Sequence, residues 1–466
     1  MELSHKWQTK GIMEGPAEEC GVIGIYSPEC DADIASLSYL ALYALQHRGQ
    51  QSAGICVSGE DGFESQRGLG LVTDVFEKED LAEMSGNLAL GHVRYSTTGS
   101  DKMVNAQPLL TSSIKGDLAL ALNGNIINHS ELRSNLEERG AIFHSDLDTE
   151  VIAHLTAHSF SDDPVEALVE SLHKLKGAFS LVAMTENRLV AARDPRGFRP
   201  LVLGKREDTY IVASETCAFD ILEAEKLREI EPGELIVVDE SGIQSRYYRE
   251  HCQSSFCSFE FIYFARPDSI IGGQNVRLAR KKMGWNLSKE AGIDGDIVVP
   301  VPSSGISAGL GFSEESGLPY KQGILQNKYI GRSFVMPTEN IRDLQVRAKL
   351  NPISSIINDS RIILIDDSIV RGTTSRQIIK MLRSAGAREV HMGVSSPALA
   401  YPCYYGMDTS RRQQLIAAEK SREEIREHIG ADSLTYLSRE GLLAAINAED
   451  RDYCTACFDG EYPLAR

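Results

Sequence analysis

The chain has 466 residues and a formal net charge of −18 at pH 7, a charge that repels nucleic-acid phosphates and anionic membranes, so we predict neither as a partner. Its length suggests about three units of roughly 150 residues each, and no apolar run reaches the roughly eighteen residues of a membrane span. Nine cysteines without an apolar export signal at the N-terminus predict a cytoplasmic enzyme with metal-binding or catalytic thiols rather than disulfides.

The first predicted strand follows a polar segment. Residues 1–19 are rich in Glu, and strand-forming residues begin directly after Cys20, over Gly21–Tyr26. A single cysteine at such a place is most often a buried apolar residue. A catalytic role for this thiol can therefore be inferred only from motifs elsewhere in the chain.

Four downstream segments supply that context. They read ALQHRGQQSAGI from Ala44, GHVRYSTTG from Gly91, ALNGNIIN from Ala121 and DTEVIAH from Asp148. Together with ECGVIGIY around Cys20, and in the same order, they resemble the glutamine amidotransferase domain of the N-terminal nucleophile (Ntn) hydrolases. The resemblance covers the N-terminal half of the chain and implies an αββα sandwich over residues 20–250.

These motifs fit amide hydrolysis, which needs a nucleophile, a base, an oxyanion site and a clamp for the amino acid. If residues 1–19 are a propeptide, its removal gives Cys20 a free α-amine, whose pKa near 8 makes it a usable base beside its own thiol. With the propeptide attached, that nitrogen is an amide and cannot act as a base. Maturation is therefore part of the predicted mechanism.

The resemblance implies a role for each motif residue. The catalytic set is the nucleophile and the two oxyanion-hole residues, Cys20, Asn123 and Gly124. The glutamine-binding set holds the α-carboxylate, the α-ammonium and the rest of the substrate, and comprises Arg94, Asp148, Thr97 and Arg48. His47 and His92 fit equally well as residues near this site and as core or loop histidines.

Alternating strands and turns continue from Lys174 to about Gln244, as an antiparallel layered domain requires. Two strings within this stretch, Arg193–Gly197 and Ser214–Thr216, also match the amidotransferase family. We interpret them as structural residues that support Cys20 and the domain interface.

A second α/β domain is predicted over residues 251–410. Phe259–Pro267 reads as a strand with an exit turn, Val276–Leu287 as a helix, and Asp296–Pro302 as a buried strand. The last of these runs into the short turn Ser303–Gly305. Backbone N–H groups of such a turn can bind pyrophosphate.

The most informative stretch is RIILIDDSIVRGTTSRQ, from Arg361 to Gln377. A buried strand ends on Asp366 and Asp367, and a turn of Gly and hydroxyl residues then leads into a helix that closes at Gly386. The turn's N–H groups at the helix N-terminus can hold a phosphate. The carboxylates suit sugar hydroxyls or a Mg²⁺ shared with phosphates, so the predicted ligand is a sugar phosphate. The GxxxxGK[ST] pattern of a Walker loop is absent.

The string IDDSIVRGTTS resembles the phosphoribosyl pyrophosphate (PRPP) loop of the type I phosphoribosyltransferases, which have a doubly wound parallel sheet. That resemblance implies that Asp366 and Asp367 bind the ribose hydroxyls. The full implied PRPP-binding set is Asp366, Asp367, Ser368, Arg371, Gly372, Thr373, Thr374, Ser375, Arg332 and Lys349. The Mg²⁺ ligands would be Ser304, Asp366 and Asp367.

Two positions depart from the family pattern: Ser303 replaces an acidic residue and Gln326 a lysine. The basic stretch from Asn327 to Leu350 is either a solvated loop or, as the family resemblance implies, a lid that closes over PRPP.

The remaining motif is Cys454-Thr-Ala-Cys457, a CxxC that alone could indicate metal binding, redox chemistry or chance. The strings around Cys257 and Cys403 match the iron–sulfur branch of the amidotransferase family. The resemblance therefore implies a 4Fe–4S cluster on Cys257, Cys403, Cys454 and Cys457, with a Cys₄ zinc site as the physical alternative. The cysteines without a motif are predicted to be small buried apolar residues: Cys30, Cys56, Cys217 and Cys252.

Residues 411–466 are predicted to be a cluster-ligating tail. Within 413–446, short amphipathic helices around Ile425–Ile429 and around Leu434, Leu437 and Leu442 would dock that tail. Oxidative loss of the cluster would then unlock it.

From Cys20 to Phe458 the chain thus resembles the family of PRPP amidotransferases. That resemblance implies glutamine and PRPP as substrates, 5-phosphoribosylamine as product, feedback inhibition by purine nucleotides and a homotetramer. A hexosamine-forming amidotransferase would lack the PRPP loop. A non-catalytic PRPP-binding regulator would keep the loop, but not the amidotransferase motif set.

Overall fold

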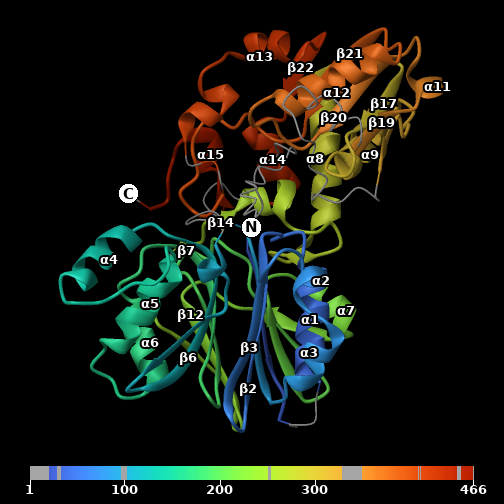
Figure 1. Cartoon of the computed structure of the whole chain (residues 1–466). Helices are drawn as coiled ribbons and strands as arrows, with labels where there is room; N and C mark the ends of the chain where they lie inside the picture. The colour runs from blue at the N-terminus through green and yellow to red at the C-terminus, as the bar shows by residue number, and fades with distance from the viewer. Residues whose placement is uncertain are drawn as a thin grey trace, which may run out of the picture.

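The computed structural model describes residues 20–28, 33–95, 102–249, 253–327, 349–407, 409, 411–448 and 453–464. The predicted propeptide, Cys30, Thr97, Cys252, Arg332 and most of the predicted lid lie outside these residues. The N-terminal domain occupies the lower half of Figure 1 and the second domain the upper half. Among the described residues, no helix combines the length and the apolar character that crossing a bilayer requires.

Two antiparallel sheets stack face to face in the N-terminal domain (Figure 1). The first has the order β11 (Glu225–Glu229), β9 (Val202–Arg206), β10 (Thr209–Ala213), β1 (Gly21–Tyr26), β4 (Leu88–Arg94), β2 (Ser52–Gly59) and β3 (Gly62–Leu69). The second has the order β13 (Gly242–Tyr247), β12 (Glu234–Asp239), β8 (Leu189–Arg193), β7 (Gly177–Met184), β6 (Gly116–Ile126) and β5 (Leu109–Ser113).

Helices cover the outer face of each sheet, so the predicted αββα sandwich is confirmed. The first sheet carries α1 (Ile34–Ala44), α2 (Val72–Val75), α3 (Lys78–Glu83) and α7 (Cys217–Leu222). The second carries α4 (His129–Glu137), α5 (Asp148–Ala157) and α6 (Pro164–Leu172). Because strand side chains alternate between faces, Val22 of β1 packs between the sheets while Ile23 and Ile25 pack against the helices.

The second domain has a parallel sheet of order β17 (Ile297–Pro300), β20 (Arg361–Asp366), β21 (Glu389–Val394) and β22 (Ser433–Tyr436), with helices on both faces. One face packs against α8 (Val276–Ala291), α9 (Ile306–Ser316) and α14 (Arg439–Ala445), and the other against α12 (Thr373–Ser384) and α13 (Arg422–Ile429). Ile363 and Ile365 of β20 face the first group, Ile362 and Leu364 the second. The predicted doubly wound domain is confirmed.

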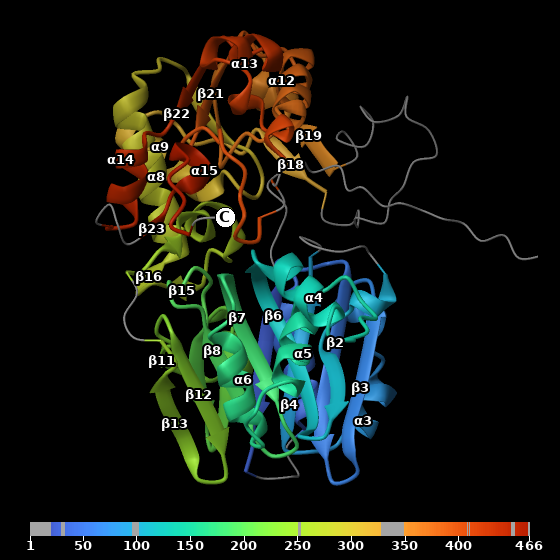
Figure 2. The same cartoon turned by 90° about the vertical axis from the view of Figure 1, so that its left-hand side faces the viewer.

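Smaller elements complete the second domain (Figures 1 and 2). They are a parallel pair of β14 (Phe256–Cys257) and β23 (Tyr453–Cys454), a hairpin of β15 (Ile270–Ile271) and β16 (Gln274–Asn275), an antiparallel pair of β18 (Ile324–Gln326) and β19 (Leu350–Pro352), and the short helices α11 (Ser354–Ile357) and α15 (Ala456–Asp459).

Two element predictions are wrong. Phe259–Pro267 is not a strand, because Glu260–Phe264 forms a turn of π-helix in which Phe261 and Phe264 are buried. Leu434 is not helical but lies on β22, which extends the parallel sheet. In Phe259–Pro267 a short apolar run had no period that separates strand from helix.

Candidate active sites

Cys20 directly precedes β1, at the place where β1 begins beside the end of β4. The pairing of Gly21 with Val93 sets Cys20 next to Arg94, and both residues are buried. The Cys20 thiol donates a hydrogen bond to the Tyr95 carbonyl at 3.4 Å. The predicted nucleophile and the predicted carboxylate-binding arginine therefore share one strand end.

Asn123 and Gly124 lie on β6 of the facing sheet. Gly124 has φ +141°, and a Cβ there would be 2.0 Å from the Ala178 carbonyl oxygen, so only glycine fits. Asn123 is fully buried, yet within the described residues neither its Nδ2 nor its Oδ1 has a hydrogen-bond partner. Burying an amide without hydrogen bonds lowers the stability of the folded protein by about 1–3 kcal/mol. A substrate oxygen that accepts a hydrogen bond from Nδ2 would reduce this loss.

Asp148 begins α5, and its buried carboxylate accepts a hydrogen bond from the Ile126 N–H at 2.9 Å. Burial raises the pKa of Asp148 above its ordinary value, although that hydrogen bond opposes the shift. A buried carboxylate of this kind gains most from a cation, as the predicted contact with the substrate ammonium requires.

Arg48 contacts the nucleophile itself. Its Nε donates to the Cys20 carbonyl at 3.0 Å, while its other nitrogens contact Glu215 at 2.5 Å and Glu260 at 2.8 and 3.0 Å. Burial alone would raise the pKa of Glu215, but His47 and Arg48 hold it below its usual value. Arg48 therefore holds the Cys20 carbonyl in place. The sequence predicted glutamine binding for Arg48 and did not predict this contact.

The two histidines left open by the sequence differ. His92 is fully buried on β4, contacts the Leu122 carbonyl through Nε2 at 3.1 Å, and burial lowers its pKa to about 3. It is a neutral core histidine. His47 contacts Glu215 at 2.8 Å and lines the pocket of the second domain.

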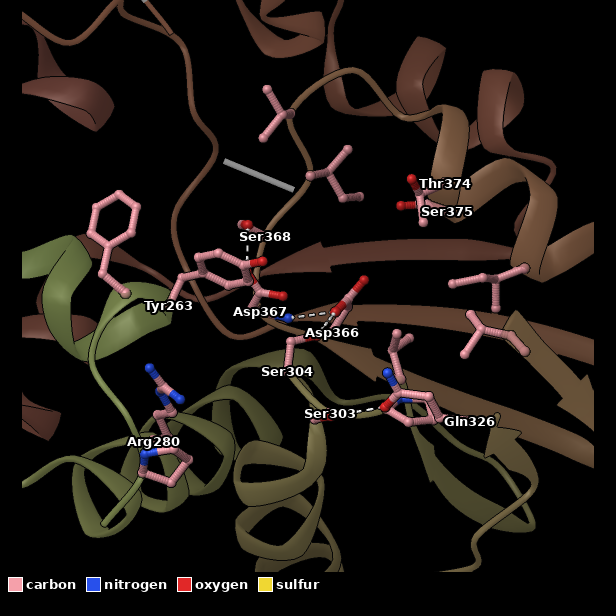
Figure 3. Close-up of a pocket in the computed structure, with 18 of the residues that line it drawn as sticks. Tyr263, Arg280, Ser303, Ser304, Gln326, Asp366, Asp367, Ser368, Thr374 and Ser375 are labelled. Carbon is pink, nitrogen blue, oxygen red and sulfur yellow. Dashed lines mark hydrogen bonds between the residues drawn. The ribbon is translucent and has the colours of Figure 1, made fainter. Parts of the chain in front are cut away.

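That pocket, of about 290 Å³, lies at the carboxyl end of β20 (Figure 3). Its lining includes much of the predicted PRPP set, namely Asp366, Asp367, Ser368, Gly372, Thr374 and Ser375, together with Ser303 and Ser304. Arg371, Thr373 and Lys349 are not among the lining residues. The backbone carbonyl of Lys349 instead accepts from Asn327 N–H at 2.8 Å, at the base of the β18–β19 pair.

The two predicted carboxylates are held by short hydrogen bonds. Ser304 Oγ donates to Asp366 at 2.8 Å, and Ser368 Oγ donates to Asp367 at 2.6 Å. Burial, and then the charge of Asp367, raise the pKa of Asp366 well above its usual value. In the described part of the chain, no three His, Cys, Asp or Glu side chains are placed to hold a metal ion. A Mg²⁺ here would therefore need phosphate oxygens as well.

The two departures from the family pattern meet in this pocket. Ser303 Oγ donates a hydrogen bond to Gln326 Oε1 at 2.9 Å (Figure 3). An acidic residue and a lysine at these positions could form an ion pair. Here an uncharged pair takes its place.

The four cysteines assigned to a cluster line one small cavity. Cys257 pairs with Cys454 across β14 and β23, while Cys403 and Cys457 complete the set. Burial raises the pKa of Cys454 to about 12, so a bound cationic centre would have to stabilise the thiolates. A 4Fe–4S cluster and a Cys₄ zinc site would each use four thiolates of this kind.

The pocket-lining residues that were not assigned to this site from the sequence include Tyr263 and Arg280. Arg280 donates to the carbonyls of Phe261 and Ala265 at 2.7 and 2.8 Å. It lies on the buried face of α8 with Ala279 and Met283. A lone arginine on an apolar helix face was the signal that could have identified it.

Comparison with known proteins gives a consistent result. A family model described as a glutamine amidotransferase domain matches residues 92–220. The amidophosphoribosyltransferase of Bacillus subtilis (strain 168) is 46% identical over 97% of this chain and 95% of its own length. That of Methanocaldococcus jannaschii is 46% identical over 95% of this chain and 97% of its own length.

Solved structures agree with these relatives. Glutamine PRPP amidotransferase from B. subtilis, in complex with ADP and GMP, matches with a TM-score of 0.90 at 46% identity, covering 95% of this chain and 97% of that chain. A structure described as the allosteric regulatory enzyme of purine biosynthesis matches with a TM-score of 0.91, also at 46% identity.

Proposed function

Because this chain belongs to the amidophosphoribosyltransferase family, we propose that its two domains carry the two halves of that reaction on the residues described above. The reaction converts glutamine, PRPP and water into 5-phosphoribosylamine, glutamate and pyrophosphate, and is the first step of purine biosynthesis. The transfer is of the pentosyl type, with an amidotransferase domain as nitrogen source.

The glutaminase half uses Cys20, whose thiol attacks the glutamine side-chain amide while its own α-amine accepts the thiol proton. The amine returns this proton to the leaving nitrogen as the C–N bond breaks, which releases ammonia and leaves a glutamyl thioester that water hydrolyses to glutamate. Asn123 and Gly124 stabilise the oxyanion, while Arg94 and Asp148 hold the amino-acid end. Arg48 positions Cys20 through its carbonyl, and Thr97 is proposed from the family resemblance. The observation that carries this assignment is the buried Asn123 side-chain amide, which lies beside Gly124 and has no hydrogen-bond partner in the part of the chain that the structure describes.

In the transferase half, Asp366 and Asp367 bind the ribose hydroxyls, and the turn from Arg371 to Ser375 binds the 5-phosphate through N–H groups at the start of α12. Arg332 and Lys349 are proposed for the pyrophosphate. Ammonia from the first half then displaces pyrophosphate from C1. Internal transfer favours this step because free ammonia is mostly protonated at pH 7 and diluted by solvent.

Two cofactors follow from the donor sets. Ser304, Asp366 and Asp367 would hold Mg²⁺ together with PRPP phosphates, where it would neutralise charge on the leaving pyrophosphate. Cys257, Cys403, Cys454 and Cys457 would hold a 4Fe–4S cluster that ties the C-terminal tail to both domains.

The finer organisation is proposed from the family resemblance. It comprises a propeptide over residues 1–19, domains at 20–250 and 251–410, a cluster-ligating tail at 411–466, a homotetramer, purine nucleotides as feedback inhibitors and a cytoplasmic location. The B. subtilis structure with ADP and GMP supports nucleotide regulation.

Anaerobic purification tests the proposed maturation and the cluster on one sample. Intact mass and N-terminal sequencing are expected to show a chain that begins at Cys20, and metal analysis about four irons per chain. A chain that begins at Met1 would contradict the α-amine base. Zinc in place of iron would contradict the cluster but leave the glutaminase assignment standing.

The raised pKa of Asp148 predicts how glutamine binding depends on pH. Its pKa is raised in the folded protein, so it takes up a proton at a higher pH than an ordinary aspartate and then loses its attraction for the substrate ammonium. The KM for glutamine is therefore expected to rise as pH falls toward that raised pKa. In Asp148→Asn the KM should be high, and this acid-side dependence should be absent. A wild-type KM independent of pH on the acid side would contradict the assignment.

A further inference from the structure

Two arginines and two glutamates form a buried ion-pair network where the domains meet: Arg48, Arg199, Glu215 and Glu260. All four side chains are 0% exposed. Glu260 is central, because its Oε1 lies 2.8 Å from Arg48 and 3.4 Å from Arg199 and its Oε2 lies 3.0 Å from Arg48. Buried ion pairs rarely improve stability over apolar packing, so a task other than stability has to be considered.

On the glutaminase side, the network ends on the nucleophile. Glu260 and Glu215 hold the Nη atoms of Arg48, and the remaining Nε donates to the Cys20 carbonyl at 3.0 Å. A residue that becomes the chain terminus loses the anchor of a preceding peptide. The direction of its amine and thiol then depends strongly on how its carbonyl is held.

On the transferase side, Glu260 is the first residue of the π-helical turn Glu260–Phe264. Tyr263 and Phe264 of this turn, and Ala265 after it, line the PRPP pocket. Arg280 lines the same pocket and donates to the Phe261 and Ala265 carbonyls. One short turn, of a kind that often marks functional sites, therefore touches both active sites.

The same network also contacts the segment that follows Cys403, one of the four cysteines of the small cavity. Arg199 Nε donates to the Tyr405 carbonyl at 3.1 Å, two residues after Cys403. Asn125 directly follows Gly124 of the proposed oxyanion hole on β6, and its side-chain amide donates to the Tyr404 carbonyl at 2.9 Å. Glu260 thus links segments from three parts of the chain.

We propose that Glu260, although it belongs to the second domain, is a positioning residue for the glutaminase nucleophile. It holds Arg48 so that Arg48 fixes the carbonyl of Cys20, and it ties this geometry to the turn that lines the PRPP pocket. The inference rests on Cys20 being the nucleophile, as proposed above. It predicts that damage at Glu260 affects glutamine use much more than ammonia use.

The variant Glu260→Gln keeps the shape and volume of the side chain but removes its charge. The kcat for glutamine hydrolysis is expected to fall about 10- to 100-fold with KM within about threefold, because a small misplacement of the reacting group carries such a penalty. Ammonia-dependent synthesis from PRPP should stay within about twofold, which also shows that the variant is folded.

A second readout does not depend on turnover. Iodoacetamide alkylation of Cys20, followed over pH by mass spectrometry of the N-terminal peptide, reports how the thiol and its amine are held. In Glu260→Gln the alkylation rate at neutral pH is expected to fall about tenfold and its pH profile to shift. Glu234→Gln is the matched control: Glu234 is 1% exposed, pairs with Arg228, and should behave as wild type.

The outcomes separate the two levels of inference. Equal loss of glutamine- and ammonia-dependent synthesis in Glu260→Gln, or an alkylation profile identical to wild type, would overturn the positioning role. Undiminished glutaminase activity in Cys20→Ala would instead overturn the assignment of the nucleophile, on which the positioning role rests.

Discussion

Replacing Cys20 with alanine is expected to lower glutamine-dependent synthesis of 5-phosphoribosylamine by about 10⁴-fold or more, because no thioester can form without the thiol. Ammonia-dependent synthesis should remain within about twofold of wild type. The physical reason is the separation of the sites: Cys20 directly precedes β1 in the sandwich, whereas the PRPP pocket lies at the carboxyl end of β20 in the other domain.

The measurement compares product formation from glutamine with that from an ammonium salt at alkaline pH, where free ammonia is available. Cys56→Ala is the matched control, since Cys56 is a fully buried thiol on β2 whose pKa burial raises to about 12. A variant at Cys20 that loses both activities would indicate that this residue supports the fold rather than the first half-reaction. The control variant should retain both.

The candidate residues of these sites could be predicted from the sequence because each group of them lies within one short segment. The strand predicted after Cys20 is β1, Gly21–Tyr26, and the stretch from Arg361 folds into β20, the acidic pair and α12 as predicted. In each, strand residues, turn residues and helix start follow one another locally. Local rules of propensity and capping therefore suffice.

What the sequence could not provide is contact between distant segments. Arg48 and Glu260 are 212 residues apart in the chain, and neither the run around Glu260 nor its apolar neighbours indicated a π-helical turn. Ser303 and Gln326 were each recognised as departures, but only the fold brings them into hydrogen-bond contact. Such pairings depend on how the elements pack, which no local period encodes.

Replacing Asp366 with asparagine is expected to reduce synthesis from both glutamine and ammonia by about 10²- to 10³-fold, because the proposed role of this carboxylate lies in the transferase half that both routes share. The same change is expected to stabilise the ligand-free protein. Asp366 is buried against Asp367 and its pKa is raised in the folded state. Ionising it therefore costs more free energy in the folded than in the unfolded chain, and the amide removes that cost.

The sign of the pH dependence makes this prediction testable. A carboxyl group with a raised folded pKa reduces stability as pH climbs from the ordinary aspartate value toward the raised one. The Tm of ligand-free Asp366→Asn should therefore exceed that of wild type at neutral pH, and the difference should shrink as pH falls. Added Mg²⁺ and PRPP should raise the Tm of wild type and have little effect on the variant.

Asp296→Asn serves as the matched control, since Asp296 lies at the opposite end of the sheet and accepts from the Arg361 N–H at 2.8 Å. It should retain both activities and the PRPP-dependent rise in Tm. If Asp366→Asn lowered the ligand-free Tm, the carboxylate pair would be a structural feature. Higher stability combined with lost transfer would instead mean that holding two carboxylates together lowers the stability of the ligand-free protein. The contacts that these carboxylates make with bound PRPP would then offset that loss.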